Sequence, residues 1–549
     1  MRGGRETDIQ MTSLPGNKEP GVVPGGGTSR TGRWLECAGI AVCLLLLTGG
    51  PVPGVNEAHY LSQARHYWDS TWCEGDFFLE SPDTHHVFFW VVGWLTTWLS
   101  LPAVAWVGRV VAALVFSVGL ARLCWSFDRR PGIALLFATL YVTLVTWTQM
   151  AGEWVVGGVE AKVFAYGFLF FGLAEMAQGR WRRVWLWMGS AAAFHVLVGG
   201  WATLAALGTW MASRDRLPLR QMWPWLMAGG VLSLPGLLPA LALGQGVDSE
   251  VAAAAHMIHV YERLSHHLLV SRFEIALVVR HVAAVLVVGI LVVGLRAWTC
   301  GRARRICMFA GGAVIIALVG GLLDLALGSG ELEAGILRFY WFRLSDAIVP
   351  LIAALLLLQL AVKFKQYSHT MSRVVLGACL LMVLANAAWT LGQRISDPRP
   401  DADRLTLPSN HSMAQRSKEI HRQWRNTCQW IRENTDRDAI FLTPRMHQTF
   451  KWYAERGEVV NWKNVPQGAE ALVEWWRRVN ELIPDQGYGF YSMETEQLQQ
   501  TMRRYNADYV VMAYDSRFKS SRLPAPLERV YHEEDGAYYR FEVYRLESR

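Results

Sequence analysis

The sequence contains few charged residues for its length and no closely spaced cysteine pair. Lys, Arg, Asp and Glu make up 18% of the 549 residues, against about 25% in a typical soluble protein. The eight cysteines include no C-x-x-C pair, the spacing expected of a zinc site or a thioredoxin-like site. Walker, H-E-x-x-H and G-x-S-x-G motifs are also absent. These absences argue against a plain soluble enzyme, an ATPase, a zincin and a secreted domain built on disulfides.

Long apolar runs account for the low charge. Hydrophobic residues make up 52% of the chain, and between residues 34 and 393 they form runs long enough to cross a bilayer. We therefore predict a polytopic α-helical membrane protein with about eleven transmembrane helices. The predicted spans are residues 34–52, 103–125, 131–150, 163–178, 184–197, 199–213, 221–244, 274–295, 306–327, 345–362 and 374–393.

The basic residues beside these spans predict the orientation of the chain. Every second joint is rich in Lys and Arg, which is typical of joints that face the cytoplasm. The basic joints are residues 126–130, 179–183, 214–220, 296–305 and 363–373. The loops predicted to face outward are residues 53–102, 151–162, 245–273 and 328–344. This predicts a multi-pass protein of the inner (plasma) membrane with a cytoplasmic N-terminus, and it explains the net charge of +7 without a nucleic-acid partner.

The two ends of the chain differ from its apolar middle. Residues 1–30 are rich in Gly and Pro without an apolar period, which predicts a disordered cytoplasmic tail. Residues 396–549 have an ordinary charge density, and helical spacing alternates there with short apolar strands. We predict a membrane domain over residues 31–395 and a periplasmic or extracytoplasmic α/β domain over residues 396–549. Cys73 and Cys428 both lie on the predicted outer side, where a disulfide between them stays open.

The first predicted outer loop, residues 53–102, carries the densest set of polar residues. Long loops with structure of their own are usually functional. The alternative is a solvated loop without chemistry. The residues of interest are the carboxylates Glu57, Asp76 and Asp83 and the imidazoles His59 and His85.

The end of this loop is apolar but too short to cross a bilayer. Over residues 87–99, Trp90, Trp94 and Trp98 repeat every four residues, which places three indoles on one helical face. Since Trp favours the headgroup region, we predict a helix that lies in the membrane interface.

Charged clusters also occur in the other predicted outer loops. Arginine forks suit a phosphate, whereas the histidines lack carboxylates at metal-ligand spacing. Arg109, early in the second span, is costly unless it is paired, and could hold an anionic headgroup. A surface ion pair is the alternative for Glu160 and Lys162, a metal site for the histidine cluster, and simple anchoring at the interface for Arg338 and Arg343. The clusters contain Glu160 and Lys162, then Arg263, His266 and His267, and finally Arg338 and Arg343.

The order of these features resembles the GT-C superfamily of integral-membrane glycosyltransferases, which includes the protein-O-mannosyltransferase and aminoarabinose-transferase groups. In this chain as in that superfamily, one membrane helix leads into a long outer loop that opens with an acidic motif. An interfacial helix, an early Arg, a second acidic patch and an outward soluble domain follow. The matching residues are 56–60 (Asn-Glu-Ala-His-Tyr) and 107–109 (Val-Gly-Arg). Residues 158–162, 193–195 and 263–267 are similar to those of bacterial multi-pass proteins of this type.

The resemblance implies transfer of a sugar from a polyprenyl-phosphate donor to an acceptor that the sequence does not identify. A carboxylate would take the proton of the acceptor hydroxyl, and Arg or Lys would stabilise the leaving phosphate. Those enzymes typically begin the loop with Asp-Glu, whereas this chain has Asn56-Glu57. Glu57 as the base, Asp76 or Asp83 in its place, and a loss of activity therefore stay open. The cations implied for the phosphate are Arg263, Lys162, Arg338 and Arg343. No cofactor is implied with certainty, and a divalent metal stays open.

Two other classes of protein compete with this interpretation. A transporter or flippase would predict symmetric halves and polar residues at mid-membrane, whereas the polar residues here gather at the predicted outer face. A non-catalytic membrane scaffold is favoured by the missing Asp of the loop motif.

Overall fold

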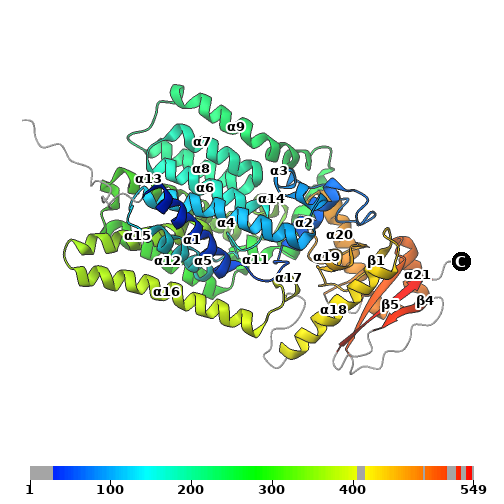
Figure 1. Ribbon diagram of the computed structural model, residues 1–549. Helices are drawn as coiled ribbons and strands as arrows, with labels where there is room; N and C mark the ends of the chain where they lie inside the picture. Colours follow the sequence, from blue (N-terminus) through cyan, green and yellow to red (C-terminus); the bar gives the residue numbers. More distant parts are fainter. Residues whose placement is uncertain (1–28, 405–413, 486–488, 516–526, 533–538, 547–549) are drawn as a thin grey trace, which may run out of the picture.

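A computed structural model describes residues 29–404, 414–485, 489–515, 527–532 and 539–546. The predicted tail over residues 1–30 lies outside the described residues except for its last two. The described chain forms a helical bundle with an α/β domain at one end (Figure 1). It is a polytopic α-helical membrane protein with a C-terminal α/β domain, as predicted.

The helices of the bundle coincide with the predicted spans. Seven of them, α1, α4, α9, α12, α13, α15 and α16, are long and apolar enough to cross a membrane. α5 and α8 are shorter apolar helices, and the count of about eleven crossings stays a prediction. The bounds are α1 (Arg30–Thr48), α4 (Leu101–Trp125), α5 (Ile133–Thr148), α6 (Ala161–Ala177), α7 (Trp181–Phe194), α8 (Val196–Ala212), α9 (Leu219–Ala242), α12 (Ile275–Gly294), α13 (Gly301–Leu327), α15 (Arg343–Lys365) and α16 (His369–Ser396).

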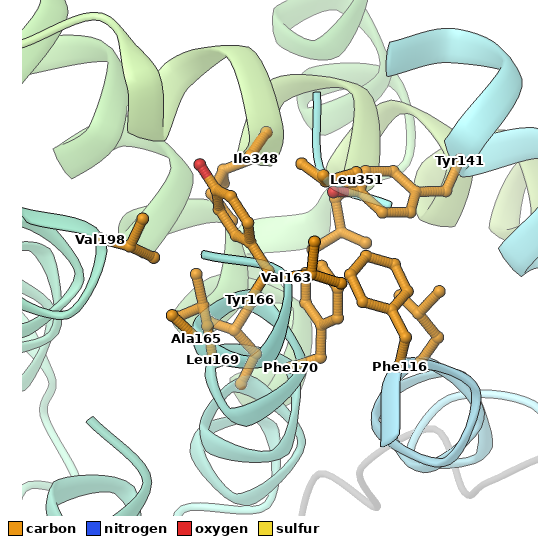
Figure 2. Close-up of a cluster of buried hydrophobic side chains, with 14 of the residues drawn as sticks. Phe116, Tyr141, Val163, Ala165, Tyr166, Leu169, Phe170, Val198, Ile348 and Leu351 are labelled. Atoms are coloured by element: carbon orange, nitrogen blue, oxygen red, sulfur yellow. The ribbon is translucent and has the colours of Figure 1, made fainter. Parts of the chain in front are cut away.

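Aromatic side chains fill the centre of the bundle. Phe116 of α4 and Tyr141 of α5 meet Phe170 of α6 edge-on, with ring centroids 4.8 and 5.6 Å from that of Phe170 (Figure 2). Ile348 and Leu351 of α15 are fully buried in the same cluster. Aromatic pairs in this geometry add about 0.5–1.5 kcal/mol each beyond the burial of their area. The position of α6 relative to α4, α5 and α15 is therefore well fixed.

The basic joints gather at one end of the bundle, where the 3₁₀ helix η4 (Ala297–Thr299) also lies. Arg305 donates to the carbonyl oxygen of Met176 at 2.8 Å and forms an ion pair with Asp215. Arg302 donates to the carbonyl oxygen of Ser126 at 3.2 Å. Four joints that are distant in sequence thus meet at one end, in agreement with the predicted alternation. The C-terminal domain lies at the other end (Figure 1).

Short elements cover the end of the bundle that faces the C-terminal domain (Figure 1). The predicted interfacial helix over residues 87–99 is divided between α3 and η1. The break is at Gly93, which packs closely against Ala64 of α2, while the three tryptophans remain exposed. These elements are α2 (Glu57–Trp68), α3 (His86–Val91), the 3₁₀ helix η1 (Gly93–Thr97), α10 (Ser249–Met257), the π-helix η2 (Ile258–Arg263), α11 (Ser265–Leu268), η3 (Val270–Arg272) and α14 (Glu331–Leu337).

The C-terminal domain is a mixed sheet of order β2-β1-β3-β5-β4. β1 pairs in parallel with β2 and β3, whereas β5 is antiparallel to β3 and β4. The predicted alternation of helices and strands is observed. The elements are α17 (Asp401–Arg404), α18 (Ala414–Asn434), β1 (Ile440–Leu442), α19 (Phe450–Ala454), β2 (Gly457–Glu458), α20 (Ala469–Leu482), η6 (Gly489–Ser492), α21 (Thr495–Arg504), β3 (Tyr509–Asp515), β4 (Leu527–His532) and β5 (Tyr539–Leu546).

Helices cover both faces of this sheet. Val510 of β3 packs in one apolar cluster with residues of α20 and α21, and its neighbour Val511 packs in another with residues of α18 and α19. This is the alternation expected of a strand that is buried on both faces. Cys73 and Cys428 are both buried and free, so the disulfide that the sequence left open is not formed.

Candidate functional site

The first outer loop opens with a carboxylate that is fully paired inside the protein. Glu57, at the start of α2, receives the fork of Arg109 from α4, with Nε–Oε1 and Nη2–Oε2 distances of 2.6 and 2.7 Å. The backbone N–H groups of Gly54 and Val159 donate to the same oxygens at 2.6 and 2.9 Å. These donors occupy the roughly four lone-pair sites of the carboxylate. The buried pair joins the first outer loop to α4 and to the loop before α6.

This pairing does not fit the predicted role of Glu57 as a base. A general base must present a free lone pair to the proton that it takes, and each oxygen of Glu57 already accepts two hydrogen bonds. The structure therefore favours a positioning role for Glu57. Arg109 also uses its donors within the protein, because its remaining Nη1 donates to the carbonyl oxygen of Gly50 at 2.5 Å. This does not fit the prediction that Arg109 holds an anionic headgroup.

Asp76, also predicted as a base, joins the first outer loop to the C-terminal domain. Its Oδ2 accepts from the backbone N–H of Glu458 at 2.9 Å and lies 3.1 Å from the Lys451 ammonium. Its Oδ1 accepts from the N–H of Leu79 at 2.9 Å. Lys451 also pairs with Glu458 at 2.6 Å, and the three charged side chains are buried. This arrangement favours an interdomain contact over the predicted catalytic role.

Charges of alternating sign lie at the N-terminal end of α6. Asn56 donates to Oε2 of Glu160 at 2.9 Å, and the Lys162 ammonium lies 3.2 Å from Oε1. The same ammonium is 3.6 Å from Glu153, whose other oxygen is 3.0 Å from Nε of Arg343. Oε1 of Glu160 receives no hydrogen bond from the described residues. Glu160 therefore keeps a lone pair that could take a proton.

Imidazoles from the first outer loop line the same region. The Tyr60 hydroxyl lies 3.3 Å from Nε2 of His85, and the backbone N–H of His85 donates to Asp83 at 2.5 Å. Gln467 of the C-terminal domain donates to the other oxygen of Asp83 at 3.2 Å. Burial lowers the pKa of His85, and burial also lowers the pKa of His59, to about 3. Both imidazoles are therefore neutral at pH 7.

The π-helix η2 presents Arg263 to the C-terminal domain. The guanidinium carbon lies 5.0 Å from the centre of the Trp462 ring, and burial lowers the pKa of Arg263 to about 10. π-turns are often found at functional sites. His266 and His267 follow in α11, and Nδ1 of His267 lies 2.5 Å from the carbonyl oxygen of Ala151. His267 therefore helps to fix the loop before α6.

The two remaining predicted arginines have different surroundings. Arg343, besides its contact with Glu153, lies 3.2 Å from Nε2 of His195 and 4.0 Å over the Tyr340 ring. It thus belongs to the charge cluster of α6. Arg338 instead lies 2.5 Å from Nε2 of His256 in α10.

The structure brings most of the predicted residues to the end of the bundle that faces the C-terminal domain. Three of these residues have structural contacts next to the cluster, in pairs that sequence spacing does not reveal: Glu57 with Arg109, and Asp76 with the C-terminal domain. Glu153 and Lys463 also belong to the cluster but were not predicted as site residues. A signal existed for Glu153, because it lies with Glu160 in the predicted outer loop over residues 151–162. Lys463 had no signal, because it comes from the C-terminal domain.

The described ranges show no ready-made metal site. No group of three or more His, Cys, Asp or Glu side chains in them is arranged to hold a metal ion. A divalent metal stays an untested prediction.

Gly152 fixes the loop that carries Glu153. Its φ is +73°, and a Cβ at this position would lie 2.7 Å from the His267 ring. We expect Gly152→Ala to lower the free energy of unfolding by at least about 1–2 kcal/mol, because alanine is disfavoured in the left-handed region and the ring must also move. Thermal unfolding measures this. Gly208→Ala in α8, where a Cβ meets nothing within 4 Å, is the control and should not destabilise. Equal losses in the two variants would refute the role of Gly152.

Comparisons with known proteins concern the fold. The model of a family described as "Domain of unknown function (DUF6798)" matches residues 422–482, within the C-terminal domain. No curated protein matches the chain in sequence. Among solved structures, the chain is similar to ArnT from Cupriavidus metallidurans bound to undecaprenyl phosphate. The TM-score is 0.49 and the identity 14%, over 95% of this chain and 99% of that chain.

A second similar structure is the Archaeoglobus fulgidus oligosaccharyltransferase in complex with zinc and sulfate. The TM-score is 0.38 and the identity 11%, over 86% of this chain and 67% of that chain. Because both TM-scores lie below 0.5, the role of the site is inferred from its own side chains.

Proposed function

We propose that this chain is an integral-membrane glycosyltransferase that moves a sugar from a polyprenyl-phosphate donor to an acceptor at the outer face of the membrane. The observation that carries the proposal is the cluster of Lys162, Arg263 and Lys463 beside Glu160, where membrane helices meet the C-terminal domain. Cations at this position would stabilise the charge that develops on a leaving phosphate. A carboxylate among them would activate an acceptor hydroxyl.

Glu160 is the base in this proposal. Asn56 donates to Oε2, whereas Oε1 accepts no hydrogen bond from the described residues and lies beside the Lys162 ammonium. Glu57 has no free lone pair, as described above. Asp83 is the alternative among the predicted acids, since it is partly exposed and lies beside His85.

An apolar groove supports a lipid-linked donor. It has a volume of about 520 Å³ and lies among α7, α8 and α9, where Trp185, Met188, Leu197, Leu204, Leu226 and Phe339 are among its lining residues. Its lining residue Val196 follows His195, which contacts Arg343. Phe339 follows Arg338 in the sequence. A prenyl chain in this groove would direct its phosphate toward the cationic cluster.

The proposal predicts turnover of a lipid-linked sugar. The purified protein is added to a total lipid and glycan extract of the membranes in which it occurs, and the polyprenyl-phosphate pools are followed by mass spectrometry. We expect one polyprenyl-phosphate sugar to decline while free polyprenyl phosphate rises by the same amount. The Arg263→Ala variant, which removes a cation for the leaving phosphate, is the matched control and should convert less. Pools that stay constant with the wild-type protein would favour a scaffold over a transferase.

A further inference from the structure

We propose that the C-terminal domain completes the binding site, and that Lys463 from this domain and Arg263 from the membrane domain together bind a phosphate monoester. The inference rests on the proposed function in taking the headgroup of the polyprenyl-phosphate donor as the source of that phosphate. It deepens that function by assigning the phosphate to one pair of cations, of which Lys463 and its domain had not been assigned to the site from the sequence.

The segment that carries Lys463 is held in place from several sides. The backbone N–H of Lys463 donates to Oδ1 of Asn461 at 2.9 Å, and the carbonyl oxygen of Asn461 accepts from Trp475 at 3.0 Å. The side chain of Asn464 donates to Glu458 at 3.2 Å. Since Glu458 also contacts Asp76 of the first outer loop, the segment is tied to the membrane domain. The position of Lys463 is therefore built into the interface and does not depend on a free loop.

Lys463 and Arg263 are cations without a carboxylate partner. Within the described part of the chain, neither the Lys463 ammonium nor the Arg263 guanidinium takes part in a hydrogen bond or an ion pair with protein, and Nε of Arg263 is a buried donor without an acceptor. Arg263 is only 8% exposed. By contrast, the buried cations Arg109 and Lys451 pair with carboxylates at 2.6 Å. A buried cation without a partner is costly, so Arg263 favours binding of an anion, and the half-buried Lys463 adds a second positive charge.

The surroundings of Lys463 lower the pKa of its ammonium group. Burial and the nearby positive charges of Arg263 and Lys162 lower the pKa of Lys463 to about 8, while Glu160 acts in the opposite direction. His266 and His59 also face it, and burial lowers the pKa of both imidazoles, so they are neutral above pH 7. A bound phosphate dianion would favour the charged ammonium.

A phosphate monoester fits this pair better than a neutral sugar does. Arg263 offers a fork of donors and Lys463 a point charge, and each can donate to a different phosphate oxygen. Arg343 is less suited to this role, because Glu153 already balances its charge at 3.0 Å. The phosphate would then lie at the boundary between the two domains, close to Glu160.

Binding of a lipid phosphate to the full chain in nanodiscs tests this. The probe is a polyprenyl monophosphate, compared with the polyprenol of the same length and with inorganic phosphate. We expect the wild-type protein to prefer the lipid phosphate over the polyprenol, and Lys463→Met to weaken its binding by about tenfold or more. Lys418→Met, which changes an exposed lysine of the same domain, should bind like the wild type.

The pH dependence separates a direct contact from a structural role. In Lys463→Arg the charge is retained over the pH range of the experiment, because an arginine titrates well above a lysine in the same surroundings. We expect this variant to keep most of the affinity. The ratio of wild-type affinity to Lys463→Arg affinity should fall between about pH 7 and about pH 9.5, as the ammonium near pH 8 loses its proton. Because both proteins bind the same lipid phosphate, the effect of its own ionisation on affinity cancels in this ratio.

The outcomes distinguish this inference from the proposed function. If the wild-type protein binds the polyprenol as well as the lipid phosphate, the donor itself is wrong. If the lipid phosphate is preferred but Lys463→Met binds it unchanged, or the affinity ratio is constant with pH, only the role of Lys463 is refuted. Lys463-dependent binding of inorganic phosphate without binding of the lipid would refute the lipid headgroup as the source.

Discussion

Arg109→Ala is expected to lower the free energy of unfolding by about 3–5 kcal/mol, the cost of removing one partner from a buried ion pair. The variant leaves the Glu57 carboxylate buried without its fork of donors, at the junction of the first outer loop, α4 and the loop before α6. The carbonyl oxygen of Gly50 also loses its donor. Thermal and denaturant unfolding of the purified protein in detergent measure the effect.

Arg122→Ala is the matched control for this prediction. Arg122 pairs with Glu175 at 2.6 Å, but its side chain is 37% exposed, and Arg180 and Arg183 also lie within 3.7 Å of the same carboxylate. We therefore expect a loss of at most about 1 kcal/mol. Similar losses in the two variants would refute the central structural role of the pair between Glu57 and Arg109.

Glu160→Gln is expected to reduce the rate of sugar transfer by about 10²–10⁴-fold, the usual contribution of a general base. Glutamine keeps the shape of the side chain and an oxygen that can accept from Asn56, but it cannot take a proton. Donor binding should change far less than the rate. The measurement is the initial rate of polyprenyl-phosphate release, with donor affinity determined on the same preparations.

Asp83→Asn is the control for this prediction. Asp83 accepts from the backbone N–H of His85 and from Gln467, contacts that an asparagine can preserve in part. A retained rate in Asp83→Asn with a collapsed rate in Glu160→Gln supports Glu160 as the base. The reverse pattern would assign that role to Asp83.

The membrane domain could be predicted because its signals are local. Seven of the apolar runs form helices that are long enough to cross a membrane, and the alternation of basic joints orders the runs. The division of the interfacial helix at Gly93 could not be predicted, because it depends on the approach of Ala64 from α2. Short strands such as β2 give too weak a periodic signal to fix their bounds.

The site could be predicted only in part, because its pairs are distant in sequence. Glu57 stands out in the first loop, but its role changes once Arg109 and the N–H of Val159 occupy its oxygens. Charge and motif alone do not distinguish a carboxylate whose oxygens are all hydrogen-bonded from one such as Glu160, whose Oε1 accepts no hydrogen bond from the described residues. Lys463 belongs to no motif in the sequence. Its proposed role depends on contact between the C-terminal domain and the membrane domain, which brings it near Arg263 and Glu160.

The most direct test of the account is mass spectrometry of the lipids that co-purify with the detergent-solubilised protein. The control is a variant that combines Arg263→Ala with Arg338→Ala. We predict that a polyprenyl phosphate or its sugar adduct accompanies the wild-type protein and is lost from the control. Ordinary phospholipids alone, in equal amounts in both samples, would contradict the account and favour a non-catalytic membrane protein.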